Sequence, residues 1–235
     1  MHFSRRARRE LCEASPSKLR KGVFLYMIAI IDYGVGNLFS LRSSLRAIGA
    51  QAEVTGDAAV LEKADKLILP GVGAFADAAA LLRRDGLDRV VISQARTGKP
   101  LLGICLGMQL LFDRSLEYGE HAGLGLIPGT VEPIREVIPA GCKVPHIGWN
   151  ALHFPKDKPA SPLFRYIREG DCVYFVHSYY GAHCQADTIA TAEYGPELTA
   201  AVGRDNVLGV QFHPEKSGMV GLNILRAFCE GVGTC

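Results

Sequence analysis

The stretch Lys99-Pro100-Leu101-Leu102-Gly103-Ile104-Cys105-Leu106-Gly107 decides the fold class of this chain. Its apolar first part is typical of a buried strand, and the following segment, Met108 to Leu116, has helical periodicity. Residues 103–107 read G-x-C-x-G, the strand–turn–helix pattern of a nucleophile elbow with cysteine in place of serine. The flanking glycines relieve crowding around a strained central residue, and the helix N-terminus favours a thiolate. Cys105 is therefore a candidate nucleophile, although a small buried residue in a glycine-containing turn is the alternative interpretation.

The same alternation of strand and helix extends outward through the first half of the chain. Asn37 is placed to cap one of the helices and Gly49 to end it. Such alternation predicts parallel strands joined by right-handed crossovers, hence an open α/β sheet with helices on both faces. The expected strands are Ile28 to Asp32, Lys66 to Leu69 and Lys99 to Ile104, and the expected helices are Leu38 to Ile48, Phe75 to Arg84 and Met108 to Leu116.

The second half is richer in β pattern, with proline and glycine over residues 125–165. We expect its strands to add to the sheet as antiparallel members, giving a mixed but mostly parallel sheet in one α/β domain. A final helix, Met219 to Cys229, has Ser217 as its expected N-cap. The added strands are expected at Asp171 to Tyr180, Asp187 to Ala192, Thr199 to Gly203 and Val207 to Phe212.

Composition narrows the class of protein. The 235 residues are 48% hydrophobic and 21% charged, which excludes a disordered scaffold. Residues 1–26 carry an excess of five positive charges, so the rest of the chain has a net charge of −3 and lacks the footprint of a nucleic-acid binder. Because Met27 directly precedes the first strand, we expect residues 1–26 to be a disordered extension or to lie upstream of the true start, and residues 27–235 to form the domain.

The cysteine pattern and the length of the apolar runs indicate the cellular compartment of the protein. The seven cysteines are an odd number with no C-x-x-C pair, which argues against a disulfide framework or a zinc site and favours a reducing cytoplasm. No apolar run approaches the roughly 20 residues of a membrane span. We therefore expect a cytoplasmic chain without a metal, a cofactor or a membrane contact.

A thiol nucleophile needs a base, and His213 is the histidine best placed to serve. It follows the apolar run 207–212 and precedes Pro214-Glu215. Residues i and i+2 of an extended segment share a face, so Glu215 can orient the imidazole of His213. A loop histidine beside a surface glutamate is the alternative.

Acyl transfer through a thioester also needs an oxyanion hole of backbone N–H groups. The N–H of Leu106 is one candidate, and the turn Pro70-Gly71-Val72-Gly73 offers another. A glycine-rich turn after a strand can instead cradle phosphate. This turn lacks the Lys-Ser/Thr of a P-loop and the full G-x-G-x-x-G fingerprint.

Six short motifs, in order along the chain, carry a family resemblance that covers Met27 to about Phe228. Together they resemble the class I (triad) glutamine amidotransferases and, within them, the glutaminase subunits of imidazole glycerol phosphate synthases. The motifs are Ile31-Asp32-Tyr33-Gly34-Val35-Gly36-Asn37-Leu38, Pro70-Gly71-Val72-Gly73, Gly103-Ile104-Cys105-Leu106-Gly107-Met108-Gln109, Val144-Pro145-His146-Ile147-Gly148-Trp149-Asn150, Tyr174-Phe175-Val176-His177-Ser178-Tyr179 and Gln211-Phe212-His213-Pro214-Glu215-Lys216-Ser217.

The resemblance implies hydrolysis of L-glutamine to glutamate and ammonia, with no cofactor. Cys105 would attack the amide, His213 would move the proton and Glu215 would orient His213. Glu117 would pair with the substrate ammonium, unless it is a solvated residue near a helix end. The remaining residues implied at the oxyanion site and substrate pocket are Gly71, Val72, Gly73, Leu106, Gln109, His177, Ser178 and Tyr179.

The resemblance also implies a partner, a (β/α)8-barrel cyclase that receives the ammonia and makes imidazole glycerol phosphate and an aminoimidazole carboxamide ribonucleotide. Trp149 and Asn150 would lie near that interface, although a single tryptophan is as often a core residue. The resemblance further implies that the glutaminase is nearly idle alone, because an oxyanion donor, expected at the Gly71–Val72 peptide, is misoriented until the partner binds its nucleotide.

Three other interpretations remain open from the sequence. The chain can be the glutaminase of another class I synthase, of the anthranilate or pyridoxal phosphate type. It can be a catalytically silent docking subunit, or a thiol hydrolase that needs no partner.

Overall fold

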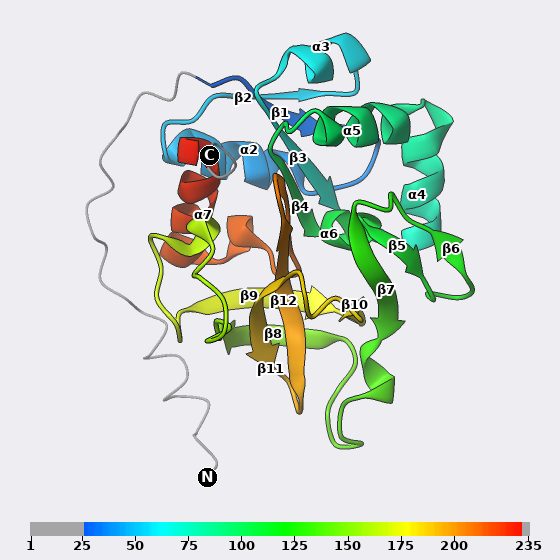
Figure 1. The fold of residues 1–235 in the computed structure, drawn as a ribbon, viewed down its shortest axis with the longest axis vertical. Helices are drawn as coiled ribbons and strands as arrows, with labels where there is room; N and C mark the ends of the chain where they lie inside the picture. Colours follow the sequence, from blue (N-terminus) through cyan, green and yellow to red (C-terminus); the bar gives the residue numbers. More distant parts are fainter. Residues whose placement is uncertain (1–25, 232–235) are drawn as a thin grey trace.

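The computed structural model describes residues 26–231, so all but the last residue of the expected extension 1–26 lies outside the described part. In the first half, the expected strands and helices before the elbow are present (Figure 1). The structure adds a strand at Ala52–Thr55 and helices at Ala58–Lys63 and Leu87–Arg96 that the sequence did not predict. The helix that follows the first strand ends where expected, because Gly49 adopts a φ of 86° just after it. Asn37 precedes this helix but makes no side-chain cap. The elements of this half are β1 (Ile28–Ile31), α2 (Leu38–Ala47), β2 (Ala52–Thr55), α3 (Ala58–Lys63), β3 (Lys66–Gly71), α4 (Phe75–Arg84), α5 (Leu87–Arg96), β4 (Leu101–Cys105) and α6 (Leu106–Leu110).

The second half is mostly β structure. Its strands are β5 (Phe112–Ser115), β6 (His121–Ala122), β7 (Ile127–Pro133), β8 (His146–Ala151), β9 (Cys172–His177), β10 (Tyr179–Ala182), β11 (Thr188–Glu193), β12 (Glu197–Arg204) and β13 (Val207–Val210). Short 3₁₀ turns lie at Ile134–Glu136, Pro162–Phe164 and Pro214–Lys216, and the last helix is α7 (Gly218–Gly231).

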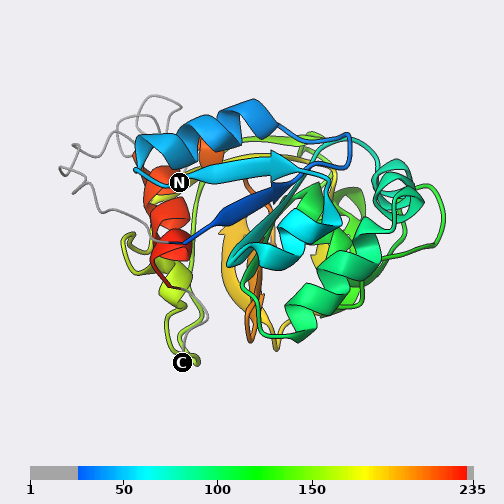
Figure 2. The same ribbon diagram turned by 90° about the horizontal axis from the view of Figure 1, so that it is seen from above.

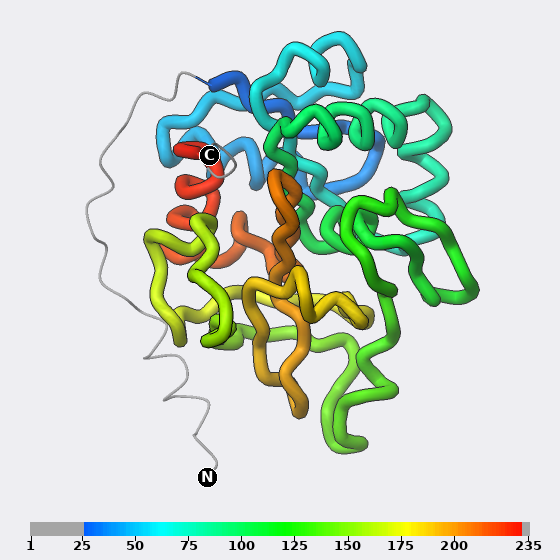
Figure 3. The backbone as a smooth tube through the Cα atoms, viewed as in Figure 1, coloured from blue at the N-terminus to red at the C-terminus, as the bar shows by residue number. Residues whose placement is uncertain are grey.

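The main sheet has seven strands in the order β11-β12-β13-β4-β3-β1-β2. The strands from β13 to β2 pair in parallel, whereas β11 and β12 are antiparallel additions, which confirms the mixed, mostly parallel sheet. Strand β4 lies in the interior of the sheet, between β3 and β13. The tube in Figure 3 shows how β13 (orange), from late in the chain, lies beside β4 (green).

Helices cover both faces of this sheet, because alternate strand residues point to opposite sides. Ile28 and Ile30 of β1 join a core with α2 and α7, and Ala29 and Ile31 join a second core with α3, α4 and α5. Figure 2 shows the β1 and β2 strands between α2 and the α3–α5 layer. Strands buried on both faces explain the continuous apolar runs in the sequence.

Two predicted elements are wrong. The expected helix from Met108 to Leu116 is instead the short helix α6 followed by strand β5, because Phe112 turns into a pocket against Gly129 and Gly181 and its segment pairs with β7. The expected strand from Asp171 to Tyr180 is broken at Ser178 into β9 and β10.

Strands β9 and β10, which replace the expected strand from Asp171 to Tyr180, do not join the main sheet as expected. Strand β10 belongs to a four-stranded sheet, β10-β7-β5-β6, and β9 pairs only with β8. Within residues 26–231, no helix combines the length and apolar character needed to cross a bilayer.

Candidate active site

Three strands of the main sheet end at the same edge and bring the predicted catalytic residues together. Gly71, at the end of β3, pairs in register with Cys105, at the end of β4. On the other side of β4, Val210 of β13 pairs with Ile104, and His213 follows three residues later. Since carboxyl ends of parallel strands form the ligand-binding edge of an α/β sheet, this edge is the candidate site.

Cys105 has the strained backbone that the elbow pattern predicts. Its φ is 55° and its ψ is −111°, a left-handed region that a non-glycine residue adopts only under constraint. The flanking glycines make the turn possible. A Cβ on Gly107 would lie 1.8 Å from the carbonyl oxygen of Leu69, and one on Gly103 would lie 2.7 Å from the carbonyl oxygen of Gly107.

His213 and Glu215 form the predicted pair. His213 Nδ1 lies 2.8 Å from Glu215 Oε1, and both side chains are almost fully buried. Burial disfavours the charged imidazolium, but the interactions of the ring with Cys105 and Glu215 outweigh it and raise the pKa of His213 to about 9. The alternative of a loop histidine beside a surface glutamate is therefore wrong, because the Glu215 side chain is buried.

The second ring nitrogen of His213 is available for proton transfer. Nε2 is buried and has no hydrogen-bond partner among the described residues. Strand β13, which leads to His213, pairs with β4, which ends at Cys105, so the thiol and the ring belong to neighbouring strand ends. Around the sulfur, Gln211 Nε2 lies at 3.7 Å and the carbonyl oxygen of Val176 at 4.0 Å.

The backbone of His213 is held on both sides. Its N–H donates to the carbonyl oxygen of Tyr174 at 2.9 Å, and its carbonyl oxygen accepts from the Ser217 hydroxyl at 2.7 Å. The same Ser217 oxygen accepts from the N–H of Tyr174 at 3.0 Å. Ser217, expected as the cap of the last helix, thus connects strand β9 to the catalytic loop.

The glycine-rich turn after β3 lies next to the elbow, as an oxyanion site requires. A Cβ on Gly71 would lie within 2.9 Å of Leu106, Gly107 and the Tyr33 hydroxyl, so no other residue fits there. Val72 is 41% exposed, and Gly73 has a φ of 98°. A narrow cleft at this edge is lined by Asn37, Leu41, Pro70, Gly71, Val72, Ile104, His213 and Glu215.

Tyr33 supports this turn, and sequence reasoning did not assign it a role. Its buried hydroxyl donates to the carbonyl oxygen of Pro70 at 2.8 Å. Burial, and then the nearby charge of Cys105, raise the pKa of Tyr33. Its position in the Ile31–Leu38 motif was the one available signal.

Gln109 and Glu117 are both buried near the edge. Gln109 Nε2 donates to the carbonyl oxygen of Tyr179 at 3.2 Å and to Gln211 Oε1 at 3.0 Å. Glu117 Oε2 accepts the N–H of Phe75, the first residue of α4, at 2.5 Å. Glu117 is thus not a solvated residue, and its charge also raises the pKa of Tyr179, after the larger effect of burial.

His177, Ser178 and Tyr179 lie at the junction of β9 and β10, where the chain passes from one small sheet to the other. The imidazole of His177 is buried with both nitrogens engaged. Nε2 lies 2.9 Å from His146 Nδ1, and Nδ1 lies 2.8 Å from the carbonyl oxygen of Tyr179. This ring therefore has no free nitrogen for a ligand in this structure.

Trp149 and Asn150, the residues expected near a partner, lie on β8. Trp149 is 44% exposed and contacts the Tyr174 ring edge-on at 6.0 Å, so it is not a core residue. Asn150 donates to the carbonyl oxygen of Glu193 at 2.7 Å, and its Oδ1 lies 2.9 Å from His146 Nε2. His146 and Gln211 were quoted in motifs but given no role, because their contacts with His177, Gln109 and Cys105 join residues far apart in the sequence.

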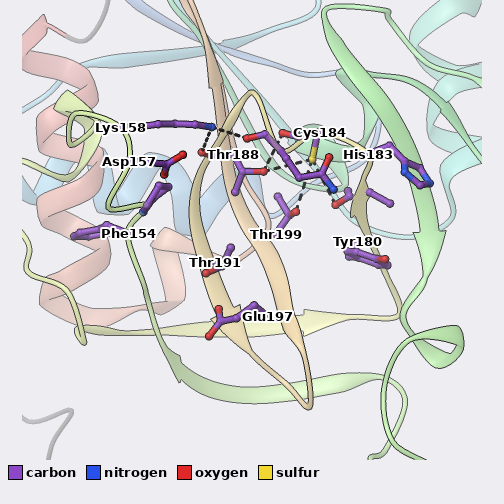
Figure 4. A pocket seen from close by; sticks show the side chains of 14 residues that line it. Phe154, Asp157, Lys158, Tyr180, His183, Cys184, Thr188, Thr191, Glu197 and Thr199 are labelled. Atoms are coloured by element: carbon purple, nitrogen blue, oxygen red, sulfur yellow. Dashed lines mark hydrogen bonds between the residues drawn. The ribbon is translucent and has the colours of Figure 1, made fainter.

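A second groove, of about 470 Å³, lies between β10, β11 and β12 and the 154–158 loop (Figure 4). Its polar groups bind the protein itself. Lys158 donates to the carbonyl oxygens of Gln185, Ala186 and Thr188, and the Cys184 thiol contacts the hydroxyls of Thr188 and Thr199. The groove contains none of the predicted catalytic residues. Residues 26–231 also hold no cluster of three or more side chains suited to a metal.

Comparison with known proteins shows to which family the chain belongs. The model of the family "Glutamine amidotransferase class-I" matches residues 29–231. A protein of Wolinella succinogenes named "Imidazole glycerol phosphate synthase subunit HisH" is 46% identical over 206 residues, which are 87% of this chain and 99% of that protein. The protein of the same name from Moorella thermoacetica is 50% identical over 204 residues, covering 86% and 94% of the two chains.

Solved structures agree on the fold. A crystal structure described as a glutamine amidotransferase superposes with a TM-score of 0.68 at 21% identity, covering 91% of this chain and all of that one. The structure of PurLQS from Thermotoga maritima gives a TM-score of 0.67 at 18% identity, covering 87% of this chain and 98% of the matched chain.

Proposed function

The chain belongs to the class I glutamine amidotransferase family, and we propose that it is the glutaminase subunit of an imidazole glycerol phosphate synthase. It hydrolyses L-glutamine to glutamate and ammonia, and the ammonia serves histidine biosynthesis. The observation that carries this function is the strained Cys105 at a strand end, beside a buried His213 whose Nε2 has no hydrogen-bond partner within residues 26–231. The relatives of this name match over nearly their whole length, which favours this synthase over the anthranilate and pyridoxal phosphate types.

The reaction follows from the geometry in two halves. The Cys105 thiolate adds to the side-chain amide carbon of glutamine, and the carbonyl electron pair moves to oxygen. The N–H groups of Val72 and Leu106 are the candidate donors to this oxyanion. The His213 imidazolium then gives its Nε2 proton to the leaving nitrogen, the C–N bond breaks, and ammonia and a thioester result.

Water completes the cycle. Neutral His213 takes a proton from water as the oxygen attacks the thioester, the C–S bond breaks, and glutamate leaves. This step restores the thiolate and the imidazolium. Glu215 holds His213 through Nδ1, so the same Nε2 atom serves both proton transfers.

The substrate would be held by its α-amino and α-carboxyl groups outside the triad. Glu117 is the proposed partner of the substrate ammonium, since it is a buried carboxylate close to Tyr179. Gln109, Ser178 and Tyr179 are the proposed walls of this pocket, with His177 acting through its bond to the Tyr179 backbone rather than by direct contact.

The proposed partner is a (β/α)8-barrel cyclase that forms a heterodimer with this chain and consumes the ammonia. Support comes from apolar side chains exposed near the catalytic edge. Phe39, at the start of α2, is 84% exposed, and Val72 and Trp149 are also exposed. The same proposal assigns the chain to the cytoplasm, where thiols such as Cys105 stay reduced.

The test replaces Cys105 with alanine in the assembled synthase. We expect glutamine-dependent turnover to fall by several decades while ammonia-dependent synthesis is retained, because only the first needs the nucleophile. Cys142→Ala, a partly exposed thiol outside the site, is the matched control. Retained glutamine-dependent turnover would exclude Cys105, and loss of both activities would indicate a docking subunit. Full glutaminase activity without a partner would indicate a stand-alone thiol hydrolase.

A further inference from the structure

A chain of hydrogen-bonding side chains connects the partner-facing strand β8 to the wall of the substrate pocket. His146 of β8 and His177 of β9 are direct cross-strand partners, and both are buried. Their rings face each other through His146 Nδ1 and His177 Nε2 at 2.9 Å. The outer nitrogens of the two rings reach Asn150 Oδ1 at 2.9 Å and the carbonyl oxygen of Tyr179 at 2.8 Å.

The hydrogen-bonded series from Asn150 through His146 and His177 to Tyr179 has a hydrogen-bond acceptor at each end. The Tyr179 end is a backbone carbonyl and can only accept. The amide of Asn150 is oriented by its other half, since Nδ2 donates to the carbonyl oxygen of Glu193 at 2.7 Å. Asn150 therefore presents its oxygen to His146, and each outer nitrogen of the histidine pair faces an oxygen lone pair.

Three contacts between two acceptors require three protons on two imidazoles, but neutral histidines carry only two. The surroundings favour the neutral forms. Burial lowers the pKa of His146 and lowers the pKa of His177 to about 3. His146 also stacks between the rings of Tyr194 and Phe175, and within residues 26–231 no acidic side chain is hydrogen-bonded to either imidazole. One of the three contacts must therefore lack a proton.

The contact between His177 Nδ1 and the Tyr179 carbonyl oxygen can lack a proton at the lowest cost in free energy. The Tyr179 carbonyl oxygen also accepts from Gln109 Nε2, so it stays satisfied without His177. Asn150 Oδ1 has His146 as its one hydrogen-bond donor within the described residues. In the free chain both histidines should thus carry their proton on Nε2, pointing toward Asn150.

We propose that His146 and His177 are positioning residues that act as a tautomeric relay between the Asn150 amide and the Tyr179 carbonyl. The relay deepens the function proposed above and rests on it for its role in glutaminase activity. When a partner group turns the Asn150 amide so that its N–H faces His146 Nε2, the proton of His177 Nε2 passes to His146 Nδ1. Water takes the proton that leaves His146 Nε2 and supplies one to His177 Nδ1, so both rings stay neutral. His177 then donates to the Tyr179 carbonyl oxygen.

The effect reaches the nucleophile through two further side chains. The Tyr179 carbonyl anchors Gln109, Gln109 donates to Gln211, and Gln211 Nε2 lies 3.7 Å from Cys105 Sγ. A second donor at Tyr179 changes how firmly Gln109 is held, and so changes the surroundings of the sulfur. Docking of a partner at β8 in this way changes the surroundings of the Cys105 sulfur through the positions of protons, without movement of a strand.

The relay is tested on the full chain by ¹⁵N NMR of its histidine ring nitrogens, with Asn150→Ala compared to wild type. We expect both rings to be protonated on Nε2 in the wild type and on Nδ1 in the variant, because the terminal acceptor is gone. Asn223→Ala, which removes a surface amide on α7, should leave both tautomers unchanged. A doubly protonated ring in the wild type, or a His177 tautomer that ignores Asn150→Ala, overturns the proposal.

A kinetic test separates the relay from the function it rests on. His146→Phe keeps the aromatic stack but cuts the chain, and we expect kcat/KM for glutamine in the assembled synthase to fall about fivefold, the effect of one neutral hydrogen bond. Ammonia-dependent turnover should not change, and His153→Phe, at a partly exposed histidine, should alter neither. An unchanged glutamine rate refutes the positioning role. A wild type without glutaminase activity refutes the proposed function and leaves the NMR result standing.

Discussion

Replacement of Glu215 by glutamine tests how the triad holds its proton. The change keeps the shape of a buried side chain whose Oε1 lies 2.8 Å from His213 Nδ1. The carboxylate accepts a hydrogen bond from the Nδ1–H of His213, and its charge stabilises the imidazolium. A glutamine amide has no charge, and its NH₂ group can donate to Nδ1, which moves the remaining proton to Nε2. In that tautomer Nε2 cannot accept a proton from water.

The expected magnitude follows from the pKa of His213, which rises from 6.5 to about 9 although burial alone would lower it. That rise corresponds to about 3 kcal/mol in favour of the imidazolium. Cys105 and Glu215 share the effect, so loss of the Glu215 carboxylate lowers the pKa of His213. We expect glutamine-dependent kcat to fall by about 10²-fold or more, since both the charge and the tautomer are lost.

The assay is glutamine-dependent turnover of the assembled synthase across pH 6 to 10, with ammonia-dependent turnover measured in parallel. Glu197→Gln is the control, because Glu197 makes a similar 2.7 Å contact to His153 away from the site. A Glu215→Gln enzyme that keeps its glutamine-dependent rate within tenfold of wild type would refute the role assigned to the carboxylate. An equal loss of glutamine-dependent turnover in Glu197→Gln would show that the effect of Glu215→Gln does not arise at the triad.

Three further changes test the surroundings of the triad. Gly107→Ala would bring a Cβ to 1.8 Å from the Leu69 carbonyl oxygen, so we expect a loss of more than about 3 kcal/mol of stability in thermal unfolding, and a normal Tm would contradict the elbow packing. Tyr33→Phe leaves a buried β3 carbonyl without its donor, and urea unfolding should show a loss of about 1–3 kcal/mol rather than an unchanged midpoint. Because the folded pKa of His177 is about 3, below the unfolded 6.5, its stabilising contribution is complete above pH 6.5 and declines as pH falls toward 3. His177→Gln should therefore make the free energy of unfolding depend less steeply on pH between 6 and 4, and an unaltered slope would argue against a neutral buried ring.

The elements that could be predicted are those whose cause is local. The G-x-C-x-G pattern and the two-residue spacing of His213 and Glu215 are each visible within a few residues, although the need for Gly107 comes from Leu69 on the neighbouring strand. Strands β1, β3 and β4 and helices α2 and α4 follow from the periodicity within each segment. Elements β2, α3 and α5 were not predicted.

The features that could not be predicted depend on distant partners. Phe112 ends helix α6 early because it fits against Gly129 and Gly181, which periodicity within 108–116 does not reveal. The break at Ser178 arises because the chain leaves one sheet for another. Ser217 resembles a helix cap in sequence, yet its hydroxyl binds the backbone of His213.

The central place of β4 in the sheet has a consequence for the newly made chain. Cys105 is made about a hundred residues before His213, and β13, which leads to His213, pairs with β4. A growing polypeptide that has not yet made β13 therefore contains the sulfur but not its base. We expect such an unfinished chain to release no ammonia from glutamine, because the thiol has no group to activate it.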